Sequence, residues 1–164
     1  MNLGFYIATR NKLGRRDVFL FQSRDDGLDY LLYHGMKIDK ALLDELTERA
    51  KGNPRRRMHY DLRDSEEDGS MRMLNAIEPE TVIPIHRHRE TSEDVIVLRG
   101  EAVEVLYDAE GREVERYHMA QGSWCIACHV PVGMYHTCKS LRSGTVIFEF
   151  KNGRYDPERT EELL

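Results

Sequence analysis

The stretch of sequence that decides the fold is HRHRETSEDVIVLRG, residues 86–100. His86 and His88 stand two residues apart at the end of a predicted strand, so both side chains point to the same face. Glu93 follows after a tight connection, where the next predicted strand begins. Farther along, PVGMYH places His136 at the start of another predicted strand. Three imidazoles and one carboxylate from neighbouring strands therefore predict a single metal site.

The donor set indicates the kind of ion. Neutral imidazole nitrogens and a carboxylate oxygen suit divalent transition metals, and a site with four protein ligands leaves coordination positions open. The expected cofactor is iron, nickel, zinc, manganese or copper, and the residues do not select among them. The alternative for His86 and His88 taken alone is a pair of surface histidines in a loop. The joint spacing with Glu93 and His136 favours the metal site.

The same residues resemble the two motifs of the cupin family. The matching positions are His86-x-His88, Glu93 and Gly100 for the first motif, and Pro131-x-Gly133-x-x-His136 for the second. Cys125 stands where the second motif usually has glycine, and Ser140 where it often has asparagine. Neither position is a metal ligand in cupins. The resemblance implies a mainly all-β protein, a cupin jelly-roll β-barrel, with the metal held by the three histidines and the glutamate.

Within cupins, a finer resemblance covers the chain from about Met36 to Pro157. The segments ALLDELTERAKGNPRRRMHYDL, MRMLNAIEPET, PIHRH and YDP are similar to those of WbuC-type cupin-fold metalloproteins, small bacterial proteins often associated with O-antigen polysaccharide loci. This resemblance implies a sugar-derived ligand and a role in surface polysaccharide metabolism. The net positive charge of a divalent ion with one carboxylate and three neutral imidazoles separately predicts a small anionic ligand. The resemblance leaves open whether the protein is an enzyme and, if so, whether it is an isomerase, an epimerase or a dioxygenase.

The rest of the chain predicts the domain organisation. Residues 36–157 form the expected cupin domain, in which the N-cap Asp39 and apolar residues at helical spacing predict a helix over 39–51. About eight short segments rich in β-branched and aromatic residues predict a jelly roll over 71–150. Residues 1–35 form an accessory extension, either a hairpin or an addition to a core that begins at Met36. Residues 158–164 are expected to be a charged tail or a short helix.

Composition bounds the classes of function. The 164 residues suit one domain, and a net charge of −5 argues against a nucleic-acid partner. No apolar run reaches the roughly 18 residues of a membrane helix, so no membrane partner is expected. The three cysteines lack the spacing of a disulfide framework, and the start of the chain lacks a signal-peptide pattern. These features predict a cytoplasmic protein.

Several polar residues before the first metal motif are candidates for ligand binding. They are Arg55, Arg57, Arg72 and Asn75. Arginine forks bind phosphate or carboxylate, and the asparagine amide offers a hydrogen bond. The alternative is that the arginines pair with acidic residues between positions 61 and 68, and that the asparagine pairs with a strand edge.

The pattern Cys125-x-x-Cys128-His129 matches the attachment site of c-type haem. It lies in a predicted strand, where residues three apart face opposite sides, and it is not accompanied by an export signal. Two small apolar strand cysteines are therefore the preferred interpretation.

Three classes of function remain open from the sequence. The first is a metal-dependent enzyme, the second a non-catalytic metal-dependent binding or sensor module, and the third a metal-free jelly-roll sugar epimerase with a His–Asp pair and a tyrosine. A homodimer is also expected, because Ile83, Ile85, Ile96 and Leu98 alternate with the inward-facing set and would form an apolar outer face.

Overall fold

The computed structural model describes residues 3–10, 16–23, 29–32, 36–63, 65, 67–153, 156 and 160–163. The chain divides into two compact units, Met1–Ile38 and Asp39–Leu164. The first unit holds an antiparallel sheet of three strands in the order β1-β2-β3. These strands are β1 (Leu3–Arg10), β2 (Arg16–Ser23) and β3 (Asp29–Leu32). The sequence left open whether residues 1–35 form a hairpin or an addition to the core; in the structure β1 and β2 pair antiparallel, and β3 adds a third strand.

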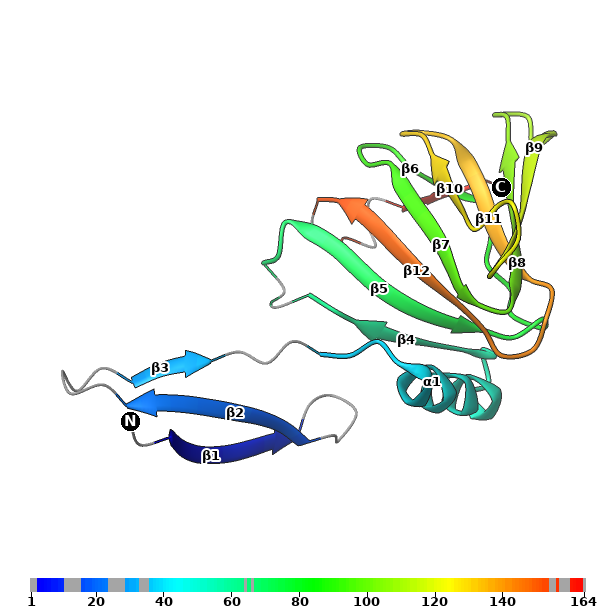
Figure 1. Ribbon diagram of the computed structural model, residues 1–164. Helices are drawn as coiled ribbons and strands as arrows, with labels where there is room; N and C mark the ends of the chain where they lie inside the picture. The colour runs from blue at the N-terminus through cyan, green and yellow to red at the C-terminus, as the bar shows by residue number, and fades with distance from the viewer. Residues whose placement is uncertain are drawn as a thin grey trace. The chain divides into compact units, whose positions relative to one another are not determined.

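The second unit contains two five-stranded antiparallel sheets (Figure 1). The first sheet has the order β10-β7-β12-β5-β4, with bounds Ala127–Val130, Glu93–Arg99, Thr145–Asn152, Ser70–Ile77 and Arg57–Asp61. The second has the order β13-β6-β11-β8-β9, with bounds Thr160–Glu162, His86–His88, Tyr135–Ser140, Glu101–Tyr107 and Glu113–Ala120. Chain order and sheet order differ in the way typical of a jelly roll.

The two sheets form the predicted jelly roll without closing into a continuous barrel. Among the described strands, β10 and β4 end the first sheet and β13 and β9 end the second, and no ladder of hydrogen bonds joins the two sheets. The architecture is a two-layer jelly roll. Side-chain packing between the inner faces holds the two sheets together.

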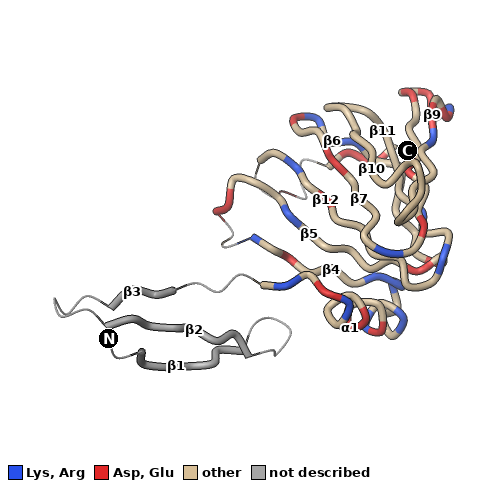
Figure 2. The backbone as a smooth tube through the Cα atoms, in the orientation of Figure 1, with Lys and Arg blue, Asp and Glu red and all other residues tan. Residues whose placement is uncertain are grey.

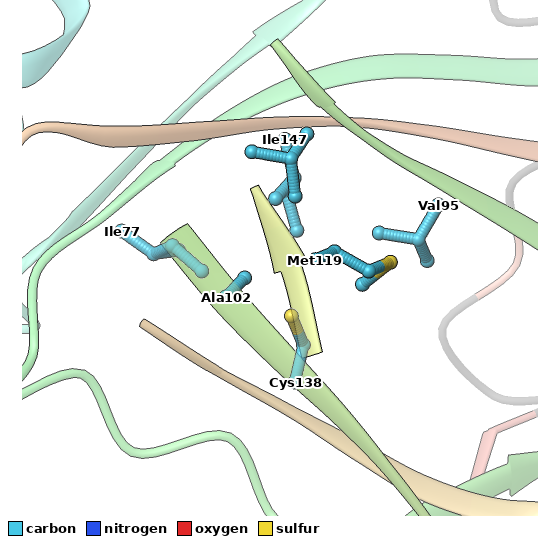
Figure 3. Close-up of a cluster of buried hydrophobic side chains, with 7 residues drawn as sticks. Ile77, Val95, Ala102, Met119, Cys138 and Ile147 are labelled. Atoms are coloured by element: carbon cyan, nitrogen blue, oxygen red, sulfur yellow. The ribbon is translucent and has the colours of Figure 1, made fainter. Parts of the chain in front are cut away.

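A cluster of buried side chains from both sheets forms the apolar part of the interior (Figure 3). The first sheet contributes Ile77, Val95, Val97 and Ile147, and the second contributes Ala102, Met119 and Cys138. Partly buried Ile83 packs against this cluster, which corrects its assignment to an outer apolar face. The loop that carries it turns inward before β6 begins. Burial of this cluster supplies the main attraction between the layers.

Helix α1 (Lys40–Gly52) packs on β4, β5 and β12 of the first sheet. The Asp39 side chain accepts a hydrogen bond from the Leu42 amide at 3.0 Å, as the sequence predicted for an N-cap. Leu42, Leu46 and Ala50 are fully buried, which confirms the apolar stripe. Figure 2 shows charged residues of both signs intermixed on the rest of the helix.

Arg99, at the end of β7, ties the helix to the sheet. Its guanidinium donates to the Leu43 carbonyl at 2.8 Å, to Thr47 Oγ1 at 2.7 Å and to the Gly144 carbonyl at 3.1 Å. It also forms an ion pair of 2.6 Å with Asp44. Arg99 thus joins helix α1 to the turn before β12, in addition to the hydrogen bonds that Thr47 Oγ1 donates within the helix.

The segment expected to be a charged tail or a short helix contains strand β13. This strand pairs antiparallel with β6, and Glu161 lies opposite Arg87. The Glu161 carboxylate accepts hydrogen bonds from Arg87 Nε at 2.9 Å and Arg89 Nε at 2.5 Å. These long-range charge pairs could not be read from the local sequence, which is why the charges suggested only a tail.

Candidate metal centre

A cavity of about 440 Å³ lies between the two sheets. The first sheet supplies its polar lining from β4, β5, β7 and β12, and the second from β6, β8, β11 and β13. Alternate residues of β5 (Met71, Met73, Asn75 and Ile77) line the cavity, because successive side chains of a strand point to opposite faces. The interior is therefore apolar in one part and polar in another.

The four predicted metal ligands meet in this cavity. His86 and His88 lie on β6, His136 lies on β11 directly opposite His86, and Glu93 begins β7 of the facing sheet. One donor atom from each residue lies within 4.8 Å of the others. The imidazole centroids are 4.3 Å apart for His86 and His136 and 5.0 Å apart for His86 and His88. Both sheets are needed to complete the group.

The free donor atoms of this group fit a metal ion. His88 Nε2 and His136 Nε2 lie 3.1 and 3.4 Å from Glu93 Oε2, and all three atoms are buried without a hydrogen bond of good geometry. His86 Nδ1 and His136 Nδ1 lie 2.9 Å from the backbone carbonyls of Pro84 and Met134. An Nδ1–H that donates to a carbonyl leaves Nε2 as a lone pair aimed at the cavity, which is the tautomer that metals bind.

The electrostatics of the group favour the protonation states of metal ligands at His86 and Glu93. Burial, and after it the neighbouring His136, lower the pKa of His86 to about 4, so His86 is neutral at pH 7. Burial by itself raises the pKa of Glu93, but the His136 and His88 imidazoles and the Lys151 ammonium outweigh it and hold that pKa well below its usual range. For His136, burial lowers the pKa, and the ionised Glu93 reverses the direction.

Three charged residues that the sequence analysis did not single out also line the cavity. They are Glu104 on β8 and Glu149 and Lys151 on β12. Lys151 Nζ lies 3.1 Å from Glu93 Oε2. Burial raises the pKa of Glu104 to about 8, and burial with the nearby Glu93 raises that of Glu149 to about 7. The available signal was a glutamate or lysine on the inward face of an otherwise apolar strand.

The candidate ligand-binding residues divide into two groups. Arg55, Arg57 and Asn75 line the cavity. Arg72 is not part of the lining and forms an ion pair of 2.5 Å with Asp68, which is the alternative expected from the acidic stretch. On β5, Arg72 points to the opposite face from Asn75, because the two positions are three apart and residues an odd number of positions apart face opposite sides of a strand.

The cysteine pattern does not form a separate site. Strand β10 begins only at Ala127, so Cys125 precedes it, and the expectation that Cys125 and Cys128 face opposite sides is wrong. Both side chains pack, partly buried, against the apolar cluster. Burial raises the pKa of the Cys128 thiol far above its usual value. The preferred interpretation, small apolar side chains, agrees with this packing.

Comparison with solved structures identifies the class of fold. The capsular polysaccharide assembling protein CapF from Staphylococcus aureus matches with a TM-score of 0.58 and 20% identity, over 68% of this chain and 32% of CapF. Oxalate decarboxylase from Bacillus subtilis matches with a TM-score of 0.52 and 16% identity, over 65% of this chain and 27% of the enzyme. An oxalate oxidase in complex with glycolate matches with a TM-score of 0.51 and 15% identity, over 65% of this chain and 55% of that one.

All three are cupin-fold proteins, and the chain spans about a third of the length of CapF. The fold and the His-His-Glu-His group together define a cupin-fold protein with a possible metal centre. The chain belongs to the family described as a domain of unknown function, DUF6016, whose model matches residues 38–119, half of the chain. No protein with a curated description matches the sequence. Among the described residues, no helix has the length and apolar character to cross a membrane.

Proposed function

We propose that this protein is a metal-binding cupin that binds or transforms a small anionic, sugar-derived ligand in surface polysaccharide metabolism, as a WbuC-type protein of the cytoplasm. The observation that carries the proposal is the convergence of four donor atoms within 4.8 Å inside a cavity of about 440 Å³. The likeness to CapF, a capsular polysaccharide assembling protein, supports the polysaccharide context. That likeness is one of fold, and the site residues carry the rest.

The charge of the cavity supports an anionic ligand. A divalent ion with one carboxylate and neutral imidazoles has a net positive charge. Arg55, Arg57 and Lys151 add cationic side chains to the lining. The raised pKa values of Glu104 and Glu149, about 8 and about 7, reduce the negative charge that these two acids carry at neutral pH. Of the other acids in the lining, Asp61 is paired with Arg63 at 2.8 Å and Glu162 is exposed to solvent. An anionic oxygen that approaches the metal group therefore meets a field of favourable sign.

The side chains have separable roles in this proposal. A divalent ion bound at this group acts as a Lewis acid toward a ligand oxygen. His86, His88, His136 and Glu93 hold the ion, and Lys151 keeps Glu93 ionised from 3.1 Å away. Arg55 and Arg57 lie where a phosphate or carboxylate group can receive charge-assisted hydrogen bonds.

The competing classes of function differ in what they require of the cavity. A metal-free epimerase needs a His–Asp pair beside its substrate. The described pair of this kind, His129 with Asp94, is more than half exposed and does not line the cavity. A binding or sensor module needs only the metal and the cationic side chains of the cavity, Arg55, Arg57 and Lys151. Turnover assays with nucleotide-sugars and measurement of oxygen uptake separate this module from an isomerase, an epimerase or a dioxygenase.

The metal part of the proposal is tested by elemental analysis of protein purified without added metal. Wild type is expected to retain close to one transition-metal ion per chain, and its identity selects among iron, nickel, zinc, manganese and copper. His88→Ala is expected to lower the retained metal at least tenfold with an unchanged circular-dichroism spectrum. His129→Ala is the matched control, because His129 is exposed and outside the cavity. Full metal content in His88→Ala contradicts the assignment.

The ligand part is tested by calorimetry with sugar phosphates, nucleotide-sugars and citrate against neutral sugars. The anionic compounds are expected to bind more tightly to the metal-loaded protein. Arg57→Ala is expected to weaken their binding, whereas Arg72→Ala, which removes an arginine outside the cavity, is expected to leave it unchanged. Equal affinity for neutral and anionic sugars contradicts the preference for anions.

We also infer a homodimer. Ile85, Ile96 and Leu98 remain partly exposed, and Trp124 and Ile126 are exposed beside the edge strand β10. Contiguous apolar surface next to an unpaired strand edge favours association with a second copy. Sedimentation equilibrium is expected to give twice the mass of the chain at micromolar concentration, and a monomer mass contradicts the dimer.

A further inference from the structure

Glu104 is a buried acid that the fold does not use. Its side chain is 1% exposed, and among the described residues neither carboxylate oxygen has a hydrogen-bond partner of good geometry. Glutamate is seldom fully buried without a partner, because burial removes its hydration and returns nothing. Leucine of similar size at this position would pack without that penalty.

The described protein groups around Glu104 do not give its carboxyl group a strong hydrogen-bond partner. On β8 it is paired with Cys138 of β11, and Ala102 on the same face belongs to the apolar cluster. The Cys138 thiol lies near enough to lower the pKa of Glu104 slightly, but a thiol is a weak donor. The carboxyl group lines the cavity that holds the metal ligands. A cavity ligand is therefore the partner that the surrounding protein lacks.

The chemistry of the group indicates what it can bind. Burial, opposed in part by His136, raises the pKa of Glu104 to about 8, so the side chain carries a proton at neutral pH. A carboxylic acid both donates and accepts a hydrogen bond, as a hydroxyl group does. A hydroxyl group of the ligand is thus the complementary partner. Above the pKa of Glu104, the ionised Glu104 side chain would repel a carboxylate of the ligand.

We propose that Glu104 is a ligand-binding residue that hydrogen-bonds a hydroxyl group of a small hydroxylated anion whose anionic oxygen is held at the metal group. This inference rests on the proposed function and deepens it, because it makes the ligand a hydroxy acid or a sugar phosphate and excludes a simple acid as the preferred occupant. Glu104 selects the ligand, whereas His86, His88, Glu93 and His136 anchor it.

The inference explains why an unpaired acid persists in the interior. A buried polar residue that serves binding lowers the stability of the ligand-free protein. Stability is regained when the ligand forms hydrogen bonds with that residue. A residue kept for the fold has the opposite signature, since its removal destabilises the ligand-free protein. Stability and selectivity measured on the same variant therefore distinguish the two roles.

The test uses two acids of three carbons that differ by one hydroxyl, lactate and propionate. Their dissociation constants are measured by calorimetry on the nickel-loaded full chain, for wild type, Glu104→Leu and Glu104→Gln. Lactate can chelate the metal in every variant, so the informative quantity is the change in the lactate-to-propionate ratio. We expect Glu104→Leu to reduce the preference for lactate about tenfold, with propionate affinity unchanged, and Glu104→Gln to retain most of it.

The second readout is thermal unfolding of the metal-free protein. We expect Glu104→Leu to unfold at a higher temperature than wild type. An unchanged ratio with metal-dependent binding of both acids overturns the role of Glu104 alone. A Glu104→Leu variant that fails to fold or melts below wild type also overturns it, since that is the behaviour of a structural residue. If neither acid shows metal-dependent binding to wild type, the proposed function fails and this inference falls with it.

Discussion

Gly100 occupies the turn between β7 and β8, and replacing it with alanine should cost more than at any open glycine of the same conformation. Its φ is +83°, in the left-handed region that favours glycine. A Cβ added there would lie 2.7 Å from Thr145 Cα and closer still to Thr145 Oγ1. The obstacle is the backbone of β12, so the clash cannot be relieved by rotating a flexible side chain.

Two contributions give the expected magnitude for Gly100→Ala. A left-handed conformation costs an L-residue about 1–2 kcal/mol, and overpacking a tight site typically costs about 1–3 kcal/mol. The sum is about 2–5 kcal/mol. Gly122→Ala is the matched control, because Gly122 has a φ of +79° with nothing within 4 Å of the added Cβ. That variant should lose only the conformational part, about 1–2 kcal/mol.

Urea unfolding of both variants, followed by circular dichroism, measures the difference. The expected result is a larger drop in the midpoint for Gly100→Ala at an unchanged slope, which attributes the loss to the native state. Thr145 Oγ1 accepts from the Glu101 amide at 3.2 Å and donates to the Arg142 carbonyl at 2.6 Å, so displacing it disturbs both chain reversals. Equal losses for the two variants would refute the steric argument.

Three further outcomes follow from the described contacts. The metal-free protein should lose stability as pH rises from about 4.5 to about 8, because the pKa of Glu104 is about 8 in the folded protein and near 4.5 in the unfolded chain. The full shift corresponds to about 5 kcal/mol of unfolding free energy. Urea unfolding across this pH range should show a smaller loss for Glu104→Gln than for wild type. Arg99→Met should lower the free energy of unfolding, measured with heat or urea, by about 2 kcal/mol, because the Leu43 carbonyl and the Thr47 hydroxyl lose their guanidinium donor. Arg116→Met is the control: Arg116 is half exposed, and its replacement should show no measurable change. Glu161→Gln should increase the rate at which a chelator removes metal, measured by absorbance of the chelator complex, because it weakens the attachment of β13 to the strand that carries His86 and His88.

The metal ligands could be predicted because their spacing is local. His86 and His88 share a face by the strand period alone, and Glu93 follows within one connection. The placement of His136 opposite His86 depends on strand pairing, and the resemblance to cupin motifs supplied it. The metal group is thus the part of the site that short-range pattern and a known motif together determine.

Glu104 and the shape of the jelly roll needed information that the sequence carries only weakly. The face of Glu104 follows from alternation with Ala102, but its lack of a partner depends on the register that places Cys138 opposite. Strand β4 (Arg57–Asp61) lies before the predicted jelly roll of 71–150, and it was missed because its side chains are mostly polar; Arg57, His59 and Asp61 line the cavity. The jelly roll itself was predicted, but whether its two sheets close into a barrel depends on pairing between edge strands, which composition does not specify.

Strand β6 carries two of the four ligands, and β13 is one of its two neighbours. Arg87 at its centre and its partner Glu161 are 74 residues apart in the chain. During synthesis from the N-terminus, His86 and His88 emerge from the ribosome long before β11 and β13 exist to hold them in place. The metal centre can take its final geometry only after residue 162 has been made. A metal ion that binds after His136 has been made but before that point therefore meets four ligands already made, two of them on a strand β6 that still lacks one of its two neighbours.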